Sequence, residues 1–177
     1  KIIPENNLPE GDILIHCGDS TNMGGMTEIT DFVYWIMGLK KYSTKIFIPG
    51  NHDFGFEDYK KYNKSIKPLW LKNLLNGENL SQSDCVYLEN DEFTIEDPEF
   101  SKPIKFYGSP CTPQFGSWAF MLPRNSDQLK EKWEKIPLDT DILITHGPPH
   151  WILDTVSRHG TTKLTGCELL FEKVREI

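Results

Sequence analysis

The chain has 177 residues, of which 38% are hydrophobic and 12% aromatic, which is enough apolar material for one domain with a real core. Its formal net charge of −7, from 26 acidic and 19 basic residues, makes nucleic acid an unlikely ligand, because such proteins present a basic face. No apolar run approaches the ~20 residues that span a bilayer. We therefore expect a cytoplasmic protein that does not bind membranes.

The ends of the sequence point to a piece of a longer protein. The chain begins at Lys1 rather than at methionine, and a helical pattern runs up to Ile177. We therefore expect residues 1–177 to be a single domain that is trimmed at both ends. Wide spacing of the cysteines favours reduced, buried thiols over a disulfide framework. The four are Cys17, Cys85, Cys111 and Cys167. The sequence does not indicate an oligomeric state.

The first half of the chain alternates strands with helices. Residues 12–16 and 45–48 are short aliphatic runs, typical of buried strands. Between them, residues 27–39 carry apolar side chains at helical spacing, with the first residue, Thr27, as the expected N-cap. Residues 57–63 and 69–75 are expected to form two helices, which a proline separates.

Short strands with acidic turns between them follow. Residues 86–88, 92–95 and 104–107 predict antiparallel hairpins. They lead into residues 108–125, an irregular stretch rich in proline and aromatic residues. A loop of this length inside a domain is often functional.

The chain then returns to helix and strand. Residues 126–135 predict a helix, residues 141–144 a strand, and a last helix is expected from Thr165 onward. Strand–helix alternation mixed with hairpins indicates a layered domain of the α/β or α+β class.

Three of the expected strands end in polar side chains beside a glycine. DILIHCGD leads to Asp19, KIFIPGNHD to Asn51, His52 and Asp53, and DILITHGPP to His146. Ligands of α/β sheets bind beyond the carboxyl ends of the strands. If these three strands are neighbours, Asp19, Asn51 and His146 converge at one edge of the sheet.

A carboxylate, an amide oxygen and an imidazole around one point indicate a divalent metal. The set has no thiolate, so mixed oxygen and nitrogen ligands favour manganese, iron or catalytic zinc over a structural zinc cage. A carboxylate such as Asp19 can bridge two ions ~3.5–4 Å apart, as in two-metal hydrolases. The alternative is structural, because Asn and Asp favour turns for backbone reasons alone. GNHD together with the two flanking motifs favours the functional interpretation.

The order of these motifs resembles the calcineurin-like metallophosphoesterase superfamily. Within it, the chain is similar to the small eukaryotic metallophosphoesterase-domain proteins grouped with class III cyclic-nucleotide phosphodiesterases. The similar stretches are GDILIHCGDST, IPGNHDF, YGSPCTPQFGSWAFMLPR, DILITHGPP and GCELL. The resemblance implies a four-layer fold, in which two mixed β-sheets are sandwiched and flanked by helices. It also implies two divalent metal ions (Mn, Fe or Zn) at one edge.

The resemblance also implies roles for single residues. Asp19 matches the metal-bridging aspartate, while Asn51 and His146 match ligands of the second metal. His52 matches the histidine that protonates the leaving oxygen, and Asp53 the acid that orients this histidine.

The chain departs from the superfamily pattern at both ends. That pattern opens with Asp-x-His before the first Gly-Asp and closes with Gly-His-x-His after the last helix, and neither motif lies in this sequence. These motifs supply most ligands of the first metal and one of the second. We therefore expect this chain alone to bind metal weakly and to be a poor catalyst.

Two further residues are candidates for substrate binding, and two functions remain open. Arg124 is either a phosphate clamp or half of a surface ion pair. His150 follows a stiff proline loop near His146 and is expected to line the cleft. The first function is hydrolysis of a phosphodiester or phosphomonoester by a two-metal hydroxide mechanism, on a cyclic nucleotide, small phosphoester or phosphoprotein. The second is a metal-free or weakly active scaffold for protein contacts.

Overall fold

The computed structural model describes residues 3–57, 74–75, 80, 84–98, 101–158 and 160–177. The helices expected at residues 57–63 and 69–75 lie outside this part of the chain, apart from Glu57, Leu74 and Leu75. No helix within the described residues is long and apolar enough to cross a membrane.

The first sheet is parallel and carries two of the three expected site segments. Its order is β1 (Ile13–Cys17), β2 (Thr44–Ile48) and β3 (Cys85–Tyr87), with Ile15 opposite Ile46. Parallel strands bring their carboxyl ends to the same edge, so the residues that follow β1 and β2 lie side by side. The antiparallel hairpin expected at β3 is wrong, because β3 pairs in parallel with β2.

The second sheet is mixed and carries the third site segment. Here β4 (Asp91–Ile95) and β5 (Ile104–Ser109) form the expected antiparallel hairpin, and β8 (Ile142–Thr145) pairs with β5 in parallel. β8 is therefore not a hydrogen-bonded neighbour of β1 or β2, so the condition set by the sequence, three neighbouring strands, is not met within one sheet. The three strands approach one another across the gap between two sheets rather than within one sheet.

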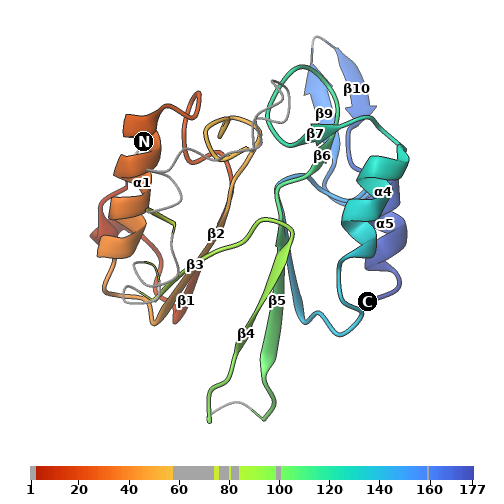
Figure 1. Ribbon diagram of the computed structural model, residues 1–177. Helices are drawn as coiled ribbons and strands as arrows, with labels where there is room; N and C mark the ends of the chain where they lie inside the picture. Colours follow the sequence, from red (N-terminus) through yellow and green to blue (C-terminus); the bar gives the residue numbers. More distant parts are fainter. Residues whose placement is uncertain (1–2, 58–73, 76–79, 81–83, 99–100, 159) are drawn as a thin grey trace.

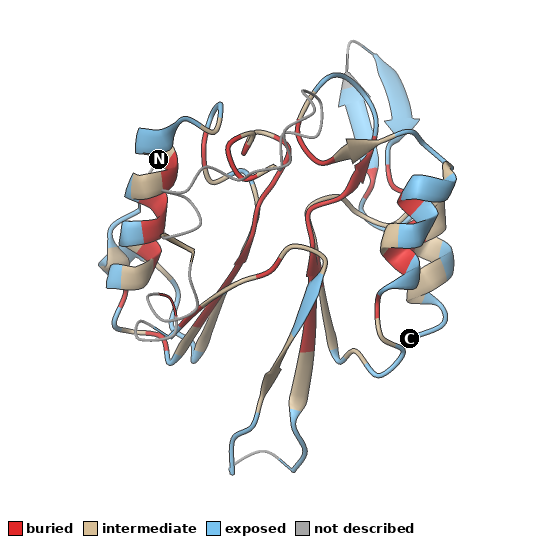
Figure 2. Ribbon diagram, in the orientation of Figure 1, coloured by how far each residue is buried: buried red, intermediate tan, exposed pale blue. Residues whose placement is uncertain are grey.

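The helices cover the outer faces of the two sheets, which gives four layers. Figure 1 shows the order from α1 (Met26–Gly38) through both sheets to α4 (Asp127–Glu134) and α5 (Glu168–Val174). The ribbon segments coloured as buried in Figure 2 follow this order, on the inner face of α1 and along β2 and β5. The fold is thus of the α+β class, as the resemblance implies.

Three apolar clusters hold the four layers together, one at each interface between layers. Each contains side chains from the two layers that it joins. Phe32 and Phe47 lie between α1 and the first sheet, Ile48 and Phe106 between the sheets, and Tyr107 and Trp133 between the second sheet and α4.

The helix starts differ from the sequence expectation at two places. Gly25, not Thr27, is the N-cap of α1, because the Glu28 carboxylate accepts hydrogen bonds from the backbone of Asn22, Met23 and Gly25. α5 begins three residues late, since residues 165–167 pair with the loop that follows β8. α4 starts as expected, with the Ser126 hydroxyl accepting from the backbone of Leu129.

Several short elements have no clear sequence signal. These are η1 (Glu5–Asn7), β6 (Thr112–Pro113), β7 (Met121–Leu122), β9 (Thr155–Arg158) and β10 (Thr161–Leu164). β6 and β7 pair inside the long loop, and β9 and β10 form an antiparallel pair in which residues 155–157 and 161–164 are exposed. All four cysteines are free, and three are buried, but Cys17 is exposed, which corrects the expectation of four buried thiols.

Candidate functional site

The structure brings Asp19, Asn51 and His146 together at the edge where the two sheets meet. His146 Nε2 lies 2.9 Å from Asn51 Oδ1 and 3.4 Å from Asp19 Oδ1. Asn51 is buried, the His146 side chain is 13% exposed, and that of Asp19 is 41% exposed. The expected convergence is therefore present, and its solvent-accessible side is Asp19.

Two glycines allow this close approach. A Cβ on Gly50 would lie 2.3 Å from Asp19 N and 2.6 Å from His146 Cε1, and a Cβ on Gly18 would lie 2.5 Å from His146 Nδ1. Gly18 has φ +97° and Asp19 has φ +57°, so the turn after β1 uses the left-handed region at two successive residues. The Gly-Asp and Pro-Gly-Asn motifs are thus steric requirements of the cluster.

The hydrogen bonds of His146 leave its Nε2 lone pair facing two oxygens. Nδ1 lies 2.8 Å from the carbonyl oxygen of Cys17, which can only accept, so Nδ1 carries the hydrogen. In the neutral ring, the Nε2 lone pair then meets Asn51 Oδ1 and Asp19 Oδ1 with no hydrogen between them. A metal cation satisfies three lone pairs that meet in this way, as does an Asn51 amide turned to place its NH₂ group against Nε2.

The distances also suit adjacent ligands of one metal ion. With metal–ligand bonds of ~2.0–2.2 Å, two ligands at right angles are about 3 Å apart. The separations of 2.9 and 3.4 Å match this spacing. Within the described ranges, no three His, Cys, Asp or Glu side chains gather as a metal site, and this cluster has two such side chains and one amide. The donors fit part of a coordination sphere.

Asp53 does not contact the imidazole of His52, contrary to the sequence prediction. Its carboxylate is fully buried and accepts from both the backbone N–H and the hydroxyl of Ser20 and of Thr21, at 2.7 to 3.1 Å. It also accepts from Gly50 N at 2.7 Å. A buried carboxylate needs such donors, and the turn after β1 supplies them. Asp53 therefore joins the two loops that carry Asp19 and Asn51.

A backbone carbonyl, instead of Asp53, orients His52. The Nδ1 atom of His52 lies 2.8 Å from the carbonyl oxygen of Asn22, and Nε2 has no hydrogen-bond partner among the residues that the structure describes. The backbone N–H of His52 donates to Asp19 Oδ1 at 3.0 Å. The ring lies beside that of Trp118, with 4.3 Å between centroids. His52 is therefore held next to the donor cluster by its other ring nitrogen and its backbone N–H.

Arg124 contacts the start of α5. Its guanidinium donates to the carbonyl oxygens of Thr165 and Gly166 and pairs with Glu168 at 2.6 Å. Thr165 and Gly166 lie in the turn before α5, and Glu168 is the first residue of α5, so these contacts fit the ion-pair alternative. Substrate binding by Arg124 stays a prediction.

His150 pairs with a buried carboxylate. Its Nδ1 lies 3.2 Å from Asp154 Oδ2, and Asp154 also accepts from Gly166 N. Burial acts to raise the pKa of Asp154, but the N–H groups of Trp151 and Gly166 and the His150 imidazole outweigh it and lower that pKa. His150 lies in the loop after His146 and pairs with Asp154. Its role in substrate binding stays a prediction.

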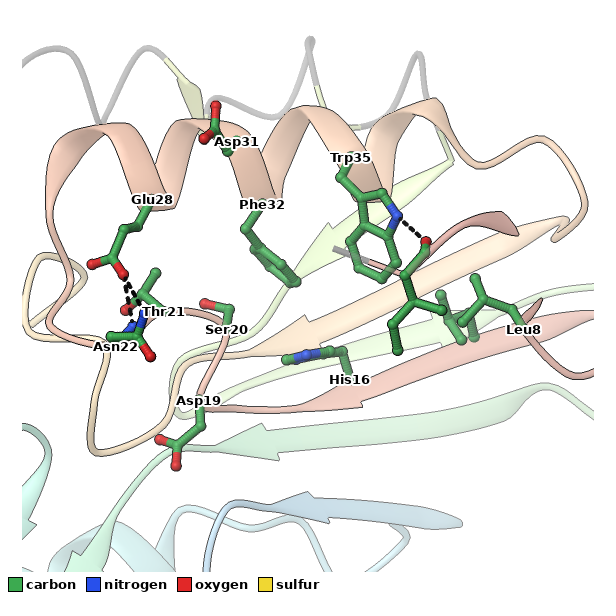
Figure 3. Close-up of a pocket in the computed structure, with 12 residues that line it drawn as sticks. Leu8, His16, Asp19, Ser20, Thr21, Asn22, Glu28, Asp31, Phe32 and Trp35 are labelled. Atoms are coloured by element: carbon green, nitrogen blue, oxygen red, sulfur yellow. Dashed lines mark hydrogen bonds between the residues drawn. The ribbon is translucent and has the colours of Figure 1, made fainter. Parts of the chain in front are cut away.

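A cavity of about 390 Å³ lies beside the cluster, between β1 and α1 (Figure 3). Leu14, Phe32 and Trp35 are among its apolar lining residues, and the ring of His16 points into it. Burial lowers the pKa of His16, although nearby carboxylates act in the opposite direction. Asp19 lines this cavity, although its carboxylate points away from α1 in this view, so the cavity and the donor cluster share Asp19.

Sequence reasoning missed the groups that hold the site together. Backbone carbonyls of Cys17 and Asn22 leave no trace in the residue pattern. The Ser20-Thr21 pair was a usable signal in the sequence, because hydroxyl residues directly after a Gly-Asp turn are suitable partners for a buried carboxylate. Trp118 lay in a loop marked as functional, although its contact was not predictable.

The fold and the cluster define a class of protein: a four-layer α+β domain with oxygen and nitrogen donors at the meeting edge of two sheets. The family model described as calcineurin-like phosphoesterase matches residues 1–173. The chain belongs to the calcineurin-like phosphoesterase family.

Curated relatives agree with this assignment. The chain is 38% identical over 177 residues to metallophosphoesterase domain-containing protein 1 of Homo sapiens, covering 95% of this chain and 51% of that protein. It is 35% identical over 158 residues to a UPF0046 protein of Caenorhabditis elegans, covering 81% and 38%. It is 40% identical over 151 residues to probable rhamnogalacturonate lyase C of Emericella nidulans, covering 84% and only 13%. The chain spans about half the length of the human relative.

Proposed function

We propose that the protein is a metal-dependent phosphoesterase that hydrolyses a phosphodiester or phosphomonoester. The observation that carries this proposal is the contact of three lone-pair donors, from Asp19, Asn51 and His146, beside an imidazole whose Nε2 has no hydrogen-bond partner among the described residues. Family membership supports the same reaction class. Cyclic nucleotides, small phosphoesters and phosphoproteins are the candidate substrates.

Asp19, Asn51 and His146 would hold divalent metal, with Asp19 placed to bridge two ions because it is the most exposed of the three. Manganese, iron and zinc suit this donor set. When bound, such ions activate water and offset charge that develops on the phosphoryl oxygens. Three donors cannot saturate two ions, so water or residues elsewhere in a longer protein complete the set.

His52 would protonate the leaving oxygen. Its Nδ1–H is held by the carbonyl of Asn22, so Nε2 is the atom that faces a substrate. The bond from its backbone N–H to Asp19 Oδ1 fixes its distance from the donor cluster. Asn51 and His52 are neighbours in sequence, yet Asn51 would bind the metal and His52 would protonate the leaving group.

The substrate would be a phosphoester on a small molecule or a phosphoprotein, met in the cytoplasm. The excess of acidic residues makes a nucleic-acid or anionic membrane partner improbable on electrostatic grounds. The same acidity is compatible with an anionic substrate, because bound cations offset it locally. We also propose that residues 1–177 form one domain.

The test compares two neighbouring variants of the manganese-loaded full-length protein. His52→Ala should lower turnover by ~10²–10⁴-fold on an ester with a poor leaving group, and much less on a nitrophenyl ester, with metal content unchanged. Asn51→Ala should lose metal and activity together on both substrates. A wild-type protein that binds manganese but hydrolyses neither ester would favour the scaffold function instead.

A further inference from the structure

The long loop at residues 108–125 places an indole directly against the proposed general acid. The ring centroid of Trp118 lies 4.3 Å from that of His52, at an interplanar angle of 35°. The ring centroid of Phe54, two residues after His52, lies 5.9 Å from that of Trp118. Aromatic contacts at this distance are attractive and specific in geometry.

Trp118 has little freedom to leave this position. The next residue, Ala119, is fully buried, and its backbone N–H donates to the carbonyl oxygen of Asn51 at 3.0 Å. After it, the N–H of Phe120 donates to the Glu57 carboxylate at 2.8 Å. The loop is therefore anchored on the Gly-Asn-His-Asp segment itself, immediately beyond the indole.

Trp118 supplies a constraint that the hydrogen bond of His52 cannot. The hydrogen bond from Nδ1 to the Asn22 carbonyl, at 2.8 Å, holds one edge of the ring, but small changes in χ1 and χ2 still let the ring plane tilt. An indole packed at 4.3 Å on the ring removes this freedom. The hydrogen bond and the indole together define one direction for Nε2.

We propose that Trp118 is a positioning residue for His52 and keeps Nε2 directed at the leaving oxygen. This inference rests on the proposed general-acid role of His52. It gives the aromatic loop a function in the chemical step, which is to hold the acid rather than to contact the metal ions. Because small displacements of a reacting group have large effects on rate, loss of the indole should slow the step that needs the proton.

The first test needs neither metal nor substrate. Proton NMR of the chain should show the His52 ring protons shifted upfield by the indole, and Trp118→Leu should abolish that shift. Trp118→Phe, which keeps an aromatic face, should retain part of it. Phe115→Ala is the matched control, because Phe115 lies in the same loop and is 70% exposed. Ring protons that are unmoved in Trp118→Leu would overturn the proposal.

The second test measures turnover of the manganese-loaded full-length protein on two diesters that differ in their leaving groups. Trp118→Leu should lose about 10- to 100-fold on diphenyl phosphate and far less on bis(4-nitrophenyl) phosphate, with Trp118→Phe between wild type and Trp118→Leu. Equal losses on both diesters, or no loss, would overturn the positioning role. Failure of the wild type to cleave either diester would instead count against the proposed function, and the NMR result would then decide on the contact alone.

Discussion

Replacing Asp53 by asparagine tests whether this carboxylate joins two loops, as the structure indicates. The change keeps the shape of the side chain and removes its charge. Oδ2 of Asp53 accepts from Ser20 N and Gly50 N, and Oδ1 accepts from Thr21 N and from the hydroxyls of Ser20 and Thr21. An asparagine amide must place its NH₂ group against one of these two sets of donors.

The less costly orientation faces the NH₂ group toward the hydroxyls, because hydroxyls can rotate and backbone groups cannot. It still leaves the N–H of Thr21 without an acceptor, at a cost of about 1–3 kcal/mol for a buried donor. The remaining bonds change from charged to neutral and weaken further. We therefore expect Asp53→Asn to lower the free energy of unfolding by about 2–4 kcal/mol.

Urea unfolding at neutral pH, followed by tryptophan fluorescence, measures this loss as a lower midpoint with an unchanged slope. Asp12→Asn is the control, because Asp12 is exposed and should tolerate the change. An Asp53→Asn variant as stable as the wild type would refute the loop-joining role. It would return Asp53 to the role that the sequence predicted, which is to orient His52.

Three further changes test other parts of the structure. Gly50→Ala should lower the free energy of unfolding in urea by about 1–3 kcal/mol, because its Cβ would lie 2.3 Å from Asp19 N. Gly38→Ala in α1 is the control and should be neutral or stabilising, because no atom lies within 4 Å of its Cβ. Burial keeps the pKa of His16 below its ordinary value of 6.5, so the neutral ring contributes fully to the free energy of unfolding above pH 6.5, and this contribution falls as the pH is lowered. His16→Gln should therefore make the free energy of unfolding less dependent on pH in this range. Arg124→Gln should lower the midpoint of unfolding without raising KM for a phosphoester, and a raised KM at unchanged stability would support the clamp interpretation.

The sequence predicted the strands and the site cluster better than the connections among them. Short aliphatic runs beside glycines identified β1, β2 and β8, because buried strands and tight turns depend on local residue types. Which sheet holds β8 depends on packing between distant segments, and no local pattern encodes it. The same reason explains β3, whose apolar residues fit a hairpin and a parallel edge equally well.

Within the site, residue types were predictable and partners were not. Asp19, Asn51 and His146 could be selected because three strand ends carry ligand-type side chains next to glycine. The partner of Asp53 was assigned to its neighbour His52, whereas the buried carboxylate is satisfied by donors more than thirty positions earlier in the chain. Arg124 shows the same limit, since a guanidinium satisfies carbonyls as well as phosphate.

The central claim is that Asp19, Asn51 and His146 bind one divalent ion at the meeting edge of the two sheets. Titration of the ¹⁵N-labelled chain with Mn²⁺ tests it directly, because a paramagnetic ion broadens nearby amide signals even when it binds weakly. We expect the signals around Asp19, Gly50 and Gly147 to broaden first, and His146→Ala to remove this selectivity. Broadening centred elsewhere, or unchanged in His146→Ala, would show that these three residues do not form the metal site.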